Sequence, residues 1–422
     1  MSKIICFSRY STPAQFESNV HYYELFSQTE TKRDIASTLG SHIPALLRKH
    51  AIVPSAPVLD FVAFALAVVA ADKLIDRGST VDGWTRKIDL TIHLHEAEKW
   101  SEQKESLEKM LRFLSGDFWE LTFIPSGEPL IEMKYAHEQK AKSCVCLLSG
   151  GIDSLVGAVD LVSENTNPLF ASQISRGDSE AQQGFANALS GASNHMQWST
   201  GRLHGSESST RARSIMFFAG ALLASCALPQ NGKRIKIFVP ENGFISINIP
   251  MNANRMGSLS TKTTHPVYMV AMQNLWNALS INAELLLPYQ YKTKGEMIKE
   301  CKNPDILHRL IFSSASCGKF RRHKLQHCGV CVPCLVRRAS FLEAGLQDLT
   351  TKGYVYEGLK NADSRDVAAV AMAIKQIETY GIERHIKSGL SFAESNDRGM
   401  YVSVISRGMT ELENLLRRHS VL

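Results

Sequence analysis

Residues 143–160 have the sequence SCVCLLSGGIDSLVGAVD, and this stretch decides the fold. An apolar run from Cys144 to Leu148 is followed by SGGIDS at 149–154, after which helix-spaced apolar residues resume. This pattern predicts a buried strand, a tight glycine turn and the start of a helix. Adjacent glycines let backbone N–H groups approach an anion, and the positive end of the helix faces the same point.

The side chains of this loop suggest a ligand. Ser149 and Ser154 supply hydroxyl donors, and Asp153 can cap the helix or help to hold Mg²⁺. The chain contains neither G-x-x-x-x-G-K-[ST] nor G-x-G-x-x-G. Alternatively, the segment binds no ligand and is only a glycine turn that joins a core strand to a core helix.

Four of the nine cysteines lie in the segment SCGKFRRHKLQHCGVCVPCLVRRASF at 316–341. The four are Cys317, Cys328, Cys331 and Cys334. Four thiolates suit tetrahedral Zn²⁺ and leave no open position, which predicts a structural site. A four-cysteine iron–sulfur cluster would use the same ligands. Neighbouring cations such as Arg337 and Arg338 are expected to offset the thiolate charge or to form a solvated face.

The SGGxDS loop is similar to that of the PP-loop ATP pyrophosphatases. With C-x₁₀-C-G-x-C-x-x-C-x-x-R about 160 residues later, the chain resembles the 7-cyano-7-deazaguanine synthase (QueC) family over roughly residues 143–345. The resemblance implies a Rossmann-like PP-loop parallel sheet with a zinc knuckle. It also implies that Ser149, Gly150, Gly151, Asp153 and Ser154 bind ATP and Mg²⁺.

The family resemblance implies an adenylation reaction. The carboxylate of 7-carboxy-7-deazaguanine attacks the α-phosphate of ATP, pyrophosphate leaves, and the acyl group passes to an amine with release of AMP. In the synthase the amine is ammonia. Here the long flanking regions resemble the layout of QueC-like proteins in Qat-type anti-phage systems, which implies transfer to the N-terminal amine of a partner protein of the defence operon. The chain could instead be an ordinary synthase, a tRNA-modifying enzyme or a nucleotide-binding scaffold.

Further site residues are expected around the loop. Gln173 and Arg176 lie at the end of the predicted strand 168–174, where the resemblance places the adenine. Arg211 and Arg213 precede an apolar helix, and Lys294 lies in the segment resembling the family's Thr-Lys helix start. These three cations are expected to stabilise charge at the α-phosphate, with Asp153 beside them.

The predicted substrate residues follow the next strand, 235–239. Glu241 or Asn242 could accept hydrogen bonds from the guanine-like edge of a base. The polar run RMGSLSTKTTHP at 255–266 adds Arg255 and Lys262, which suit an anionic ligand or a polar loop.

Four regions are expected along the chain. They are an N-terminal α+β domain (1–125), a polar linker (126–142), the PP-loop domain (143–345) with its knuckle (317–334), and a C-terminal helical extension (346–422). Within the first region, 31–50 and 55–77 are expected to be helices, Trp119, Leu121 and Phe123 to alternate along a strand, and His93 and His95 to be surface residues.

Bulk composition bounds the class of protein. The 422 residues are 44% apolar and 21% charged with a net charge of +6, which suits anionic ligands without indicating nucleic acid as a substrate. The N-terminus has too short an apolar stretch for a signal peptide, and no run is long enough to span a bilayer. The cysteine content then predicts a reducing, cytoplasmic setting. The sequence does not decide whether the chain forms a homodimer.

Overall fold

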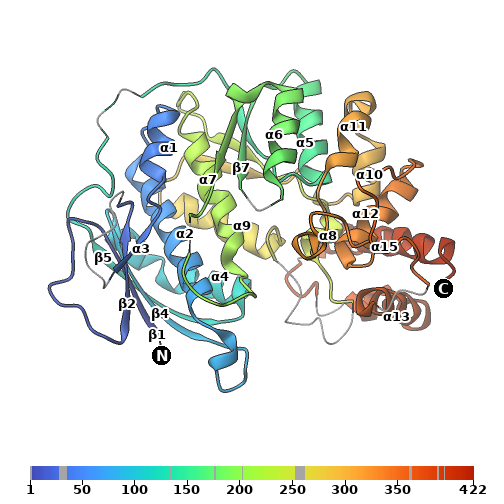
Figure 1. The fold of residues 1–422 in the computed structure, drawn as a ribbon, viewed down its shortest axis with the longest axis horizontal. Helices are drawn as coiled ribbons and strands as arrows, with labels where there is room; N and C mark the ends of the chain where they lie inside the picture. Colours follow the sequence, from blue (N-terminus) through green and yellow to red (C-terminus); the bar gives the residue numbers. More distant parts are fainter. Residues whose placement is uncertain are drawn as a thin grey trace.

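The computed structural model describes residues 2–27, 36–133, 135, 137–174, 177–201, 203–251, 262–360, 364–386, 389–393 and 395–422. It contains two five-stranded sheets in which every pairing is parallel, so the chain is an α/β protein. Figure 1 shows the N-terminal sheet at one end, the C-terminal helices at the other, and the second sheet between them.

The N-terminal sheet has the strand order β3-β2-β1-β4-β5. Its strands are β1 (Ser2–Phe7), β2 (Val20–Leu25), β3 (Ala36–Leu39), β4 (Lys87–Leu94) and β5 (Phe118–Pro125). Helices α1 (Ile43–Lys49) and α2 (Ala56–Leu74) connect β3 to β4, and α3 (Ala97–Glu102) and α4 (Lys104–Ser115) connect β4 to β5.

This sheet differs from the α+β unit that we expected. Trp119, Leu121 and Phe123 are buried between exposed neighbours along β5, as predicted. The alternation shows that one face is buried, but it carries no information about strand direction, and the helical crossovers make the sheet parallel.

Two local expectations were wrong. Within the predicted helix 31–50, β3 pairs with β2 and α1 begins only at Ile43, while residues 31–35 lie outside the described residues. His93, expected at the surface, is buried in β4, because residues 90–94 of this strand are buried on both faces of the sheet. In both places contacts with distant segments overrode the local pattern.

The second sheet has the order β10-β9-β6-β7-β8. Its strands are β6 (Cys144–Leu147), β7 (Pro168–Gln173), β8 (His195–Trp198), β9 (Ile235–Phe238) and β10 (Ala283–Leu286). The helices between them are α5 (Ile152–Ser163), α6 (Ser179–Leu189), α7 (Ile215–Ser225), α8 (Gly243–Ile247) and α9 (Pro266–Ala278). If the strands of each sheet are numbered 1 to 5 along the chain, both sheets have the strand order 3-2-1-4-5.

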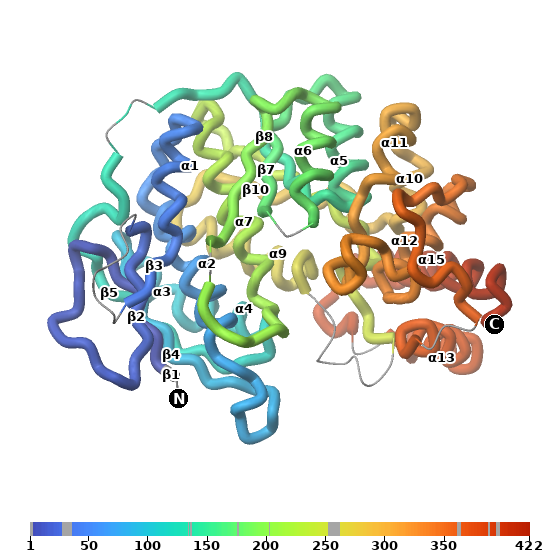
Figure 2. Tube along the Cα trace, in the orientation of Figure 1, coloured from blue at the N-terminus to red at the C-terminus, as the bar shows by residue number. Residues whose placement is uncertain are grey.

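A layer of two apolar helices joins the sheets. Helix α2 packs against β4 and against α7, and α7 packs in turn against β6 and β7. Nearly every residue of both helices is buried, as expected for helices that are apolar on all sides. One hydrophobic core thus runs from the N-terminal sheet to the second sheet, and the two helices lie between the sheets in Figures 1 and 2.

The C-terminal part is helical. Its helices are α10 (Lys294–Lys299), α11 (Pro304–Leu310), α12 (Val332–Glu343), α13 (Arg365–Tyr380), α14 (Ile382–Ile386) and α15 (Ser395–Arg418). Helices α13 and α15 pack against α12, and α15 also reaches α8, around a separate core that includes three of the clustered cysteines. None of the helices in the described ranges combines the length and apolar character needed to cross a bilayer.

Candidate functional site

The SGGxDS loop lies at the carboxyl end of β6, the strand where the order of the second sheet reverses. Gly150 has a φ of +84°, a left-handed conformation that favours glycine, and Gly151 is the N-cap of α5. The hydroxyls of Ser149 and Ser154 lie 3.1 Å apart, and Ser154 Oγ donates to the Gly151 carbonyl over 3.0 Å. These bonds fix the loop at the positive end of a 12-residue helix, an arrangement that suits phosphate.

Asp153 joins this loop to two later segments. One of its carboxylate oxygens accepts hydrogen bonds from the side-chain amide and backbone N–H of Asn242, at 2.7 and 3.3 Å. The other forms an ion pair with Lys294, whose side chain is buried. Lys294 is held in the first turn of α10 by the capping box of Thr293 and Glu296. The structure therefore brings together Asp153, Asn242 and Lys294, all of which the sequence had singled out.

Two adjoining cavities lie at this point of the fold. The first, about 220 Å³, is lined by the carboxyl ends of β6, β7 and β9 together with Gln173, Glu241 and Thr264. The second, about 270 Å³, is lined by Asp153, Lys294 and the start of α5. Ser149, Pro240, Glu241 and Ile245 line both. Open parallel sheets bind ligands at this edge, where the strand order reverses.

Gln173 gives the first cavity a hydrogen-bonding group. The side chain is 5% exposed, and its Oε1 atom has no hydrogen-bond partner among the described residues. Leaving such an oxygen buried and unpaired costs about 1–3 kcal/mol. The cavity therefore favours a ligand with an N–H donor, such as the amino group of a nucleobase.

Glu241 lies between the two cavities. Burial raises the pKa of Glu241 to about 7, and the Asp153 carboxylate contributes to the rise, while a 2.9 Å hydrogen bond from Thr264 and the charge of Lys294 oppose it. This carboxyl can therefore exchange a proton near neutral pH. When ionised, it can accept a hydrogen bond from a ring N–H.

We expect the stability of the protein to depend on pH through Glu241. The pKa of Glu241 is raised from 4.5 to about 7 in the folded protein. Its contribution to stability is therefore complete below pH 4.5, where the carboxyl is protonated in both the folded and the unfolded state, and is lost as the pH rises through about 7. The glutamine of Glu241→Gln is neutral at every pH, so this variant should exceed the parent in stability by about 3 kcal/mol at pH 8, with little difference at pH 4. Urea unfolding at both pH values measures this. The exposed Glu17→Gln is the control, and an equal effect of Glu241→Gln at both pH values would contradict the assignment.

Asn242 has a positioning role in the structure. It is fully buried, its Nδ2 donates to Asp153, and its Oδ1 accepts from the backbone N–H of Ile245 at 2.9 Å as the N-cap of α8. Both ends of the amide are therefore engaged within the protein. Of the two residues proposed to read a base edge, Glu241 has the better access to a ligand.

The predicted cations divide between two places. Asp178 lies beside the loop, because a Cβ atom placed on Gly150 would lie 3.5 Å from the Cβ atom of Asp178. The charge of Arg213 interacts with that of Asp178, which places Arg213 near the loop. Arg211 and Lys262 line a different cavity, which shares no lining residue with the two at the loop. Arg176 and Arg255 lie outside the described residues.

The four clustered cysteines converge. Their Sγ atoms all lie within 4.8 Å of one another, and the pairs Cys317–Cys331 and Cys328–Cys334 are each 3.9 Å apart. Sulfur atoms around a tetrahedral Zn²⁺ ion with bonds of ~2.3 Å are separated by ~3.8 Å. Gly329 turns the chain with a φ of +85°, and a Cβ there would lie 2.4 Å from the Tyr356 carbonyl oxygen. The group can hold a metal ion such as zinc.

The cysteine group is joined to the SGGxDS loop through the chain before it. The N–H of Ala315 donates to the carbonyl of Gly150 over 2.9 Å. Arg337, fully buried in α12, donates to the carbonyl and hydroxyl of Ser314 at 3.2 and 2.7 Å, so it holds this segment. Pro333, between two of the cysteines, lines the second cavity. The cysteine region therefore forms one wall of the candidate site.

Several contributors were not apparent from the sequence. Gln182 donates to the carbonyls of Ser149 and Gln173 at 3.4 and 3.1 Å, and Thr264 bonds to Glu241. Ala315 acts through its backbone alone. No local pattern marks such residues because their roles arise from contacts between distant segments.

Comparison of the chain with protein-family models, curated proteins and solved structures found no match.

Proposed function

We propose that this chain is a PP-loop ATP pyrophosphatase that adenylates a carboxylate and passes the acyl group to an amine. The observation that carries the proposal is the SGGxDS loop at the reversal point of a parallel 3-2-1-4-5 sheet, with Asp153 paired to Lys294 beside the helix N-terminus. That order is the one in which doubly wound sheets bind nucleotides. The loop and the parallel 3-2-1-4-5 sheet support the resemblance to the QueC family.

The two cavities suggest how ATP binds. The adenine lies in the first cavity, where Gln173 Oε1 accepts from its amino group, and the phosphates lie in the second, against the loop and Lys294. Both Asp153 oxygens contact protein donors, so Mg²⁺ would be held largely by phosphate oxygens and water, with Asp153 and Glu241 as the nearby carboxylates. Mg²⁺ would neutralise phosphate charge during adenylation.

The chemistry requires two balanced transfers. The substrate carboxylate oxygen bonds to the α-phosphorus, and the bond to pyrophosphate breaks. The amine nitrogen then bonds to the acyl carbon, AMP leaves, and the amine loses a proton. Lys294 stabilises negative charge near the α-phosphate, and ionised Glu241 can accept the proton of the amine or a ring N–H of the substrate.

The resemblance supplies the substrate class. We infer 7-carboxy-7-deazaguanine as the carboxylate and the N-terminus of a partner protein in an anti-phage system as the amine. The four cysteines are inferred to hold structural zinc, since four thiolates at this spacing leave no coordination position for a substrate.

Lys294→Ala is expected to lower the rate of ATP–pyrophosphate exchange with 7-carboxy-7-deazaguanine by about 100-fold, because it removes a cation beside the reacting phosphate. Lys299→Ala, an exposed lysine at the end of the same helix, is the matched control and should keep the parental rate. Equal rates in the parent and Lys294→Ala would refute this role of Lys294. Retained biological function in a Ser149→Ala, Asp153→Ala double variant would favour a scaffold.

The acceptor is tested by intact-protein mass spectrometry of a genomic-neighbour protein incubated with this chain, ATP, Mg²⁺ and 7-carboxy-7-deazaguanine. A mass gain equal to the acyl group is the expected result. Free 7-amido- or 7-cyano-7-deazaguanine with an unmodified protein would indicate ammonia as the acceptor and synthase chemistry. Absence of both products and of AMP would overturn the adenylation proposal.

A further inference from the structure

A third cavity, about 460 Å³, shares no lining residue with the two cavities at the SGGxDS loop and lies where three regions of the chain meet. The N-terminal region contributes Trp84 and the end of α4, the second sheet's region contributes Arg211 and residues flanking α8 and α9, and the C-terminal region contributes Phe392. Its volume is in the range of small-molecule sites, and junctions between regions are common places for them.

The charged groups of this cavity have one sign. Arg112, Arg211 and Lys262 line it, and its lining residues in the described ranges include no aspartate or glutamate. Burial lowers the pKa of Lys262, and the charge of Arg211 lowers it further, so the two cations are close enough to repel each other. A bound anion would relieve that repulsion.

Aromatic and backbone contacts hold the cations in place. The guanidinium carbon of Arg211 lies 4.5 Å from the centroid of the Trp84 ring. Lys262 Nζ lies 3.9 Å from the centroid of the Phe113 ring and donates to the Phe113 carbonyl over 3.0 Å. His265 packs edge-on against Phe113 and Phe392, which gives the cavity an apolar wall beside its cations.

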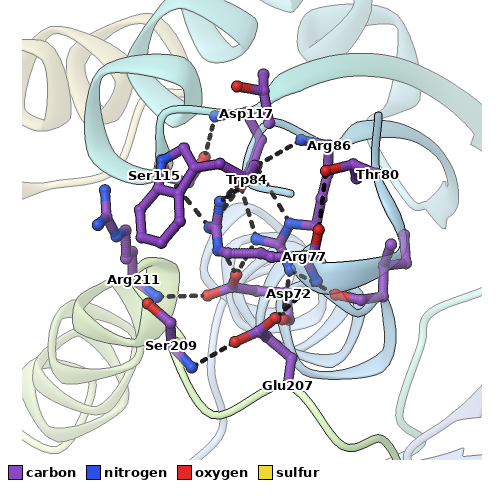
Figure 3. Close-up of polar contacts among 12 residues, drawn as sticks. Asp72, Arg77, Thr80, Trp84, Arg86, Ser115, Asp117, Glu207, Ser209 and Arg211 are labelled. Atoms are coloured by element: carbon purple, nitrogen blue, oxygen red, sulfur yellow. Dashed lines mark hydrogen bonds and ion pairs between the residues drawn. The ribbon is translucent and has the colours of Figure 1, made fainter. Parts of the chain in front are cut away.

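A buried ionic network fixes the backbone at Arg211. Asp72 Oδ2 accepts from the N–H groups of Arg211 and Ala212, at 2.7 and 2.8 Å, and Asp72 Oδ1 pairs with Arg86. Arg77 donates to the Trp84 carbonyl at 3.0 Å, so the same network holds the ring that Arg211 covers (Figure 3). The cation is thus pre-positioned, which lowers the entropy lost on binding.

We propose that this cavity is a second ligand site that binds a mononucleotide-sized organic phosphate. The phosphate would be held by Lys262, Arg211 and Arg112, and the organic part would lie against the wall formed by Phe392 and Val267. The site is distinct from the SGGxDS loop and does not depend on the activity proposed there.

The test uses AMP as the probe and the full chain carrying Lys294→Ala, which weakens phosphate binding at the loop. Calorimetry should find AMP binding, and Arg211→Ala or Lys262→Gln added to this background should weaken it at least ~10-fold. Lys109→Ala is the matched control, because Lys109 is an exposed cation of α4, the helix that also carries Arg112, and is not among the residues lining the cavity. Unchanged affinity in both cavity variants, or no AMP binding at millimolar concentration, would overturn the proposal.

Two further readouts locate the ligand. Trp84 is the half-buried tryptophan among four buried ones and lines the cavity, so AMP should change the fluorescence of the chain but not that of Trp84→Phe. Inorganic phosphate should compete with AMP, and failure to compete would refute the phosphate as the recognised group. Loss of ATP–pyrophosphate exchange in Lys294→Ala with AMP binding retained would separate this site from the proposed active site.

Discussion

Cys328→Ser is expected to weaken the binding of one metal ion per chain, so that its occupancy falls, and to lower the free energy of unfolding by about 5 kcal/mol. Structural zinc binds with roughly 10–16 kcal/mol, and three thiolates retain only part of this. Cys328 is fully buried in the C-terminal core, so its loss should loosen α12 and the helices packed on it.

The same change should reach the candidate site. Ala315 and Pro333, on either side of Cys328, contact or line the SGGxDS loop and its cavity, so we expect ATP affinity to fall together with the metal content. Metal analysis, thermal unfolding and ATP titration measure the three effects.

The control is Cys301→Ser, because Cys301 is also buried but lies outside the cysteine group. It should keep the metal and change stability far less. Full metal occupancy in Cys328→Ser, or parental stability and ATP affinity without metal, would refute a structural metal at these four residues.

Asp72→Ala is expected to lower the free energy of unfolding by about 4 kcal/mol. Asp72 and Arg86 are both fully buried, and Arg86 also pairs with Asp117 at 2.6 Å. Burial alone would raise the pKa of Asp117, but hydrogen bonds and charge from Arg86, with the charge of Arg77, lower it overall. Removing Asp72 leaves Arg86 buried with half of its counter-charge and two backbone N–H groups without their acceptor, and breaking such a pair costs about 3–5 kcal/mol.

Chemical denaturation measures the effect of Asp72→Ala against a surface pair. Glu105→Ala removes the partner of Lys109 across 2.5 Å, but both side chains are more than 70% exposed, so the loss should be far smaller than that of Asp72→Ala. If the two variants were equally destabilised, the buried network would have no special role. Because Asp72 also anchors Arg211, Asp72→Ala should weaken AMP binding at the third cavity as well.

The parts of the site that could be predicted are those written in contiguous sequence. The strand, glycine turn and helix around Ser149 follow from local spacing, and so does the convergence of Cys317 with Cys328, Cys331 and Cys334. Lys294 could be placed near the loop because it begins a helix in a segment that resembles the family.

The remaining parts depend on contacts between distant residues. Arg211 and Arg213 are two positions apart, yet Asp72 holds the backbone of the first beside Trp84, while the charge of the second interacts with that of Asp178. The short strand β3 exists because β2 offers a parallel edge, which the sequence at 36–39 does not reveal. Spacing along the chain cannot show which distant element will supply a partner.

The apolar layer of α2 and α7 has a consequence for how the chain unfolds. One face of α2 packs on the N-terminal sheet, one face of α7 packs on the second sheet, and the two helices pack on each other. If either sheet unfolded, the helix that covers the remaining sheet would lose its own partner helix. The two sheets should therefore melt as a single cooperative unit, although each has a complete topology of its own. A fragment that starts at β6 would expose the bare apolar face of α7 to water and would tend to self-associate.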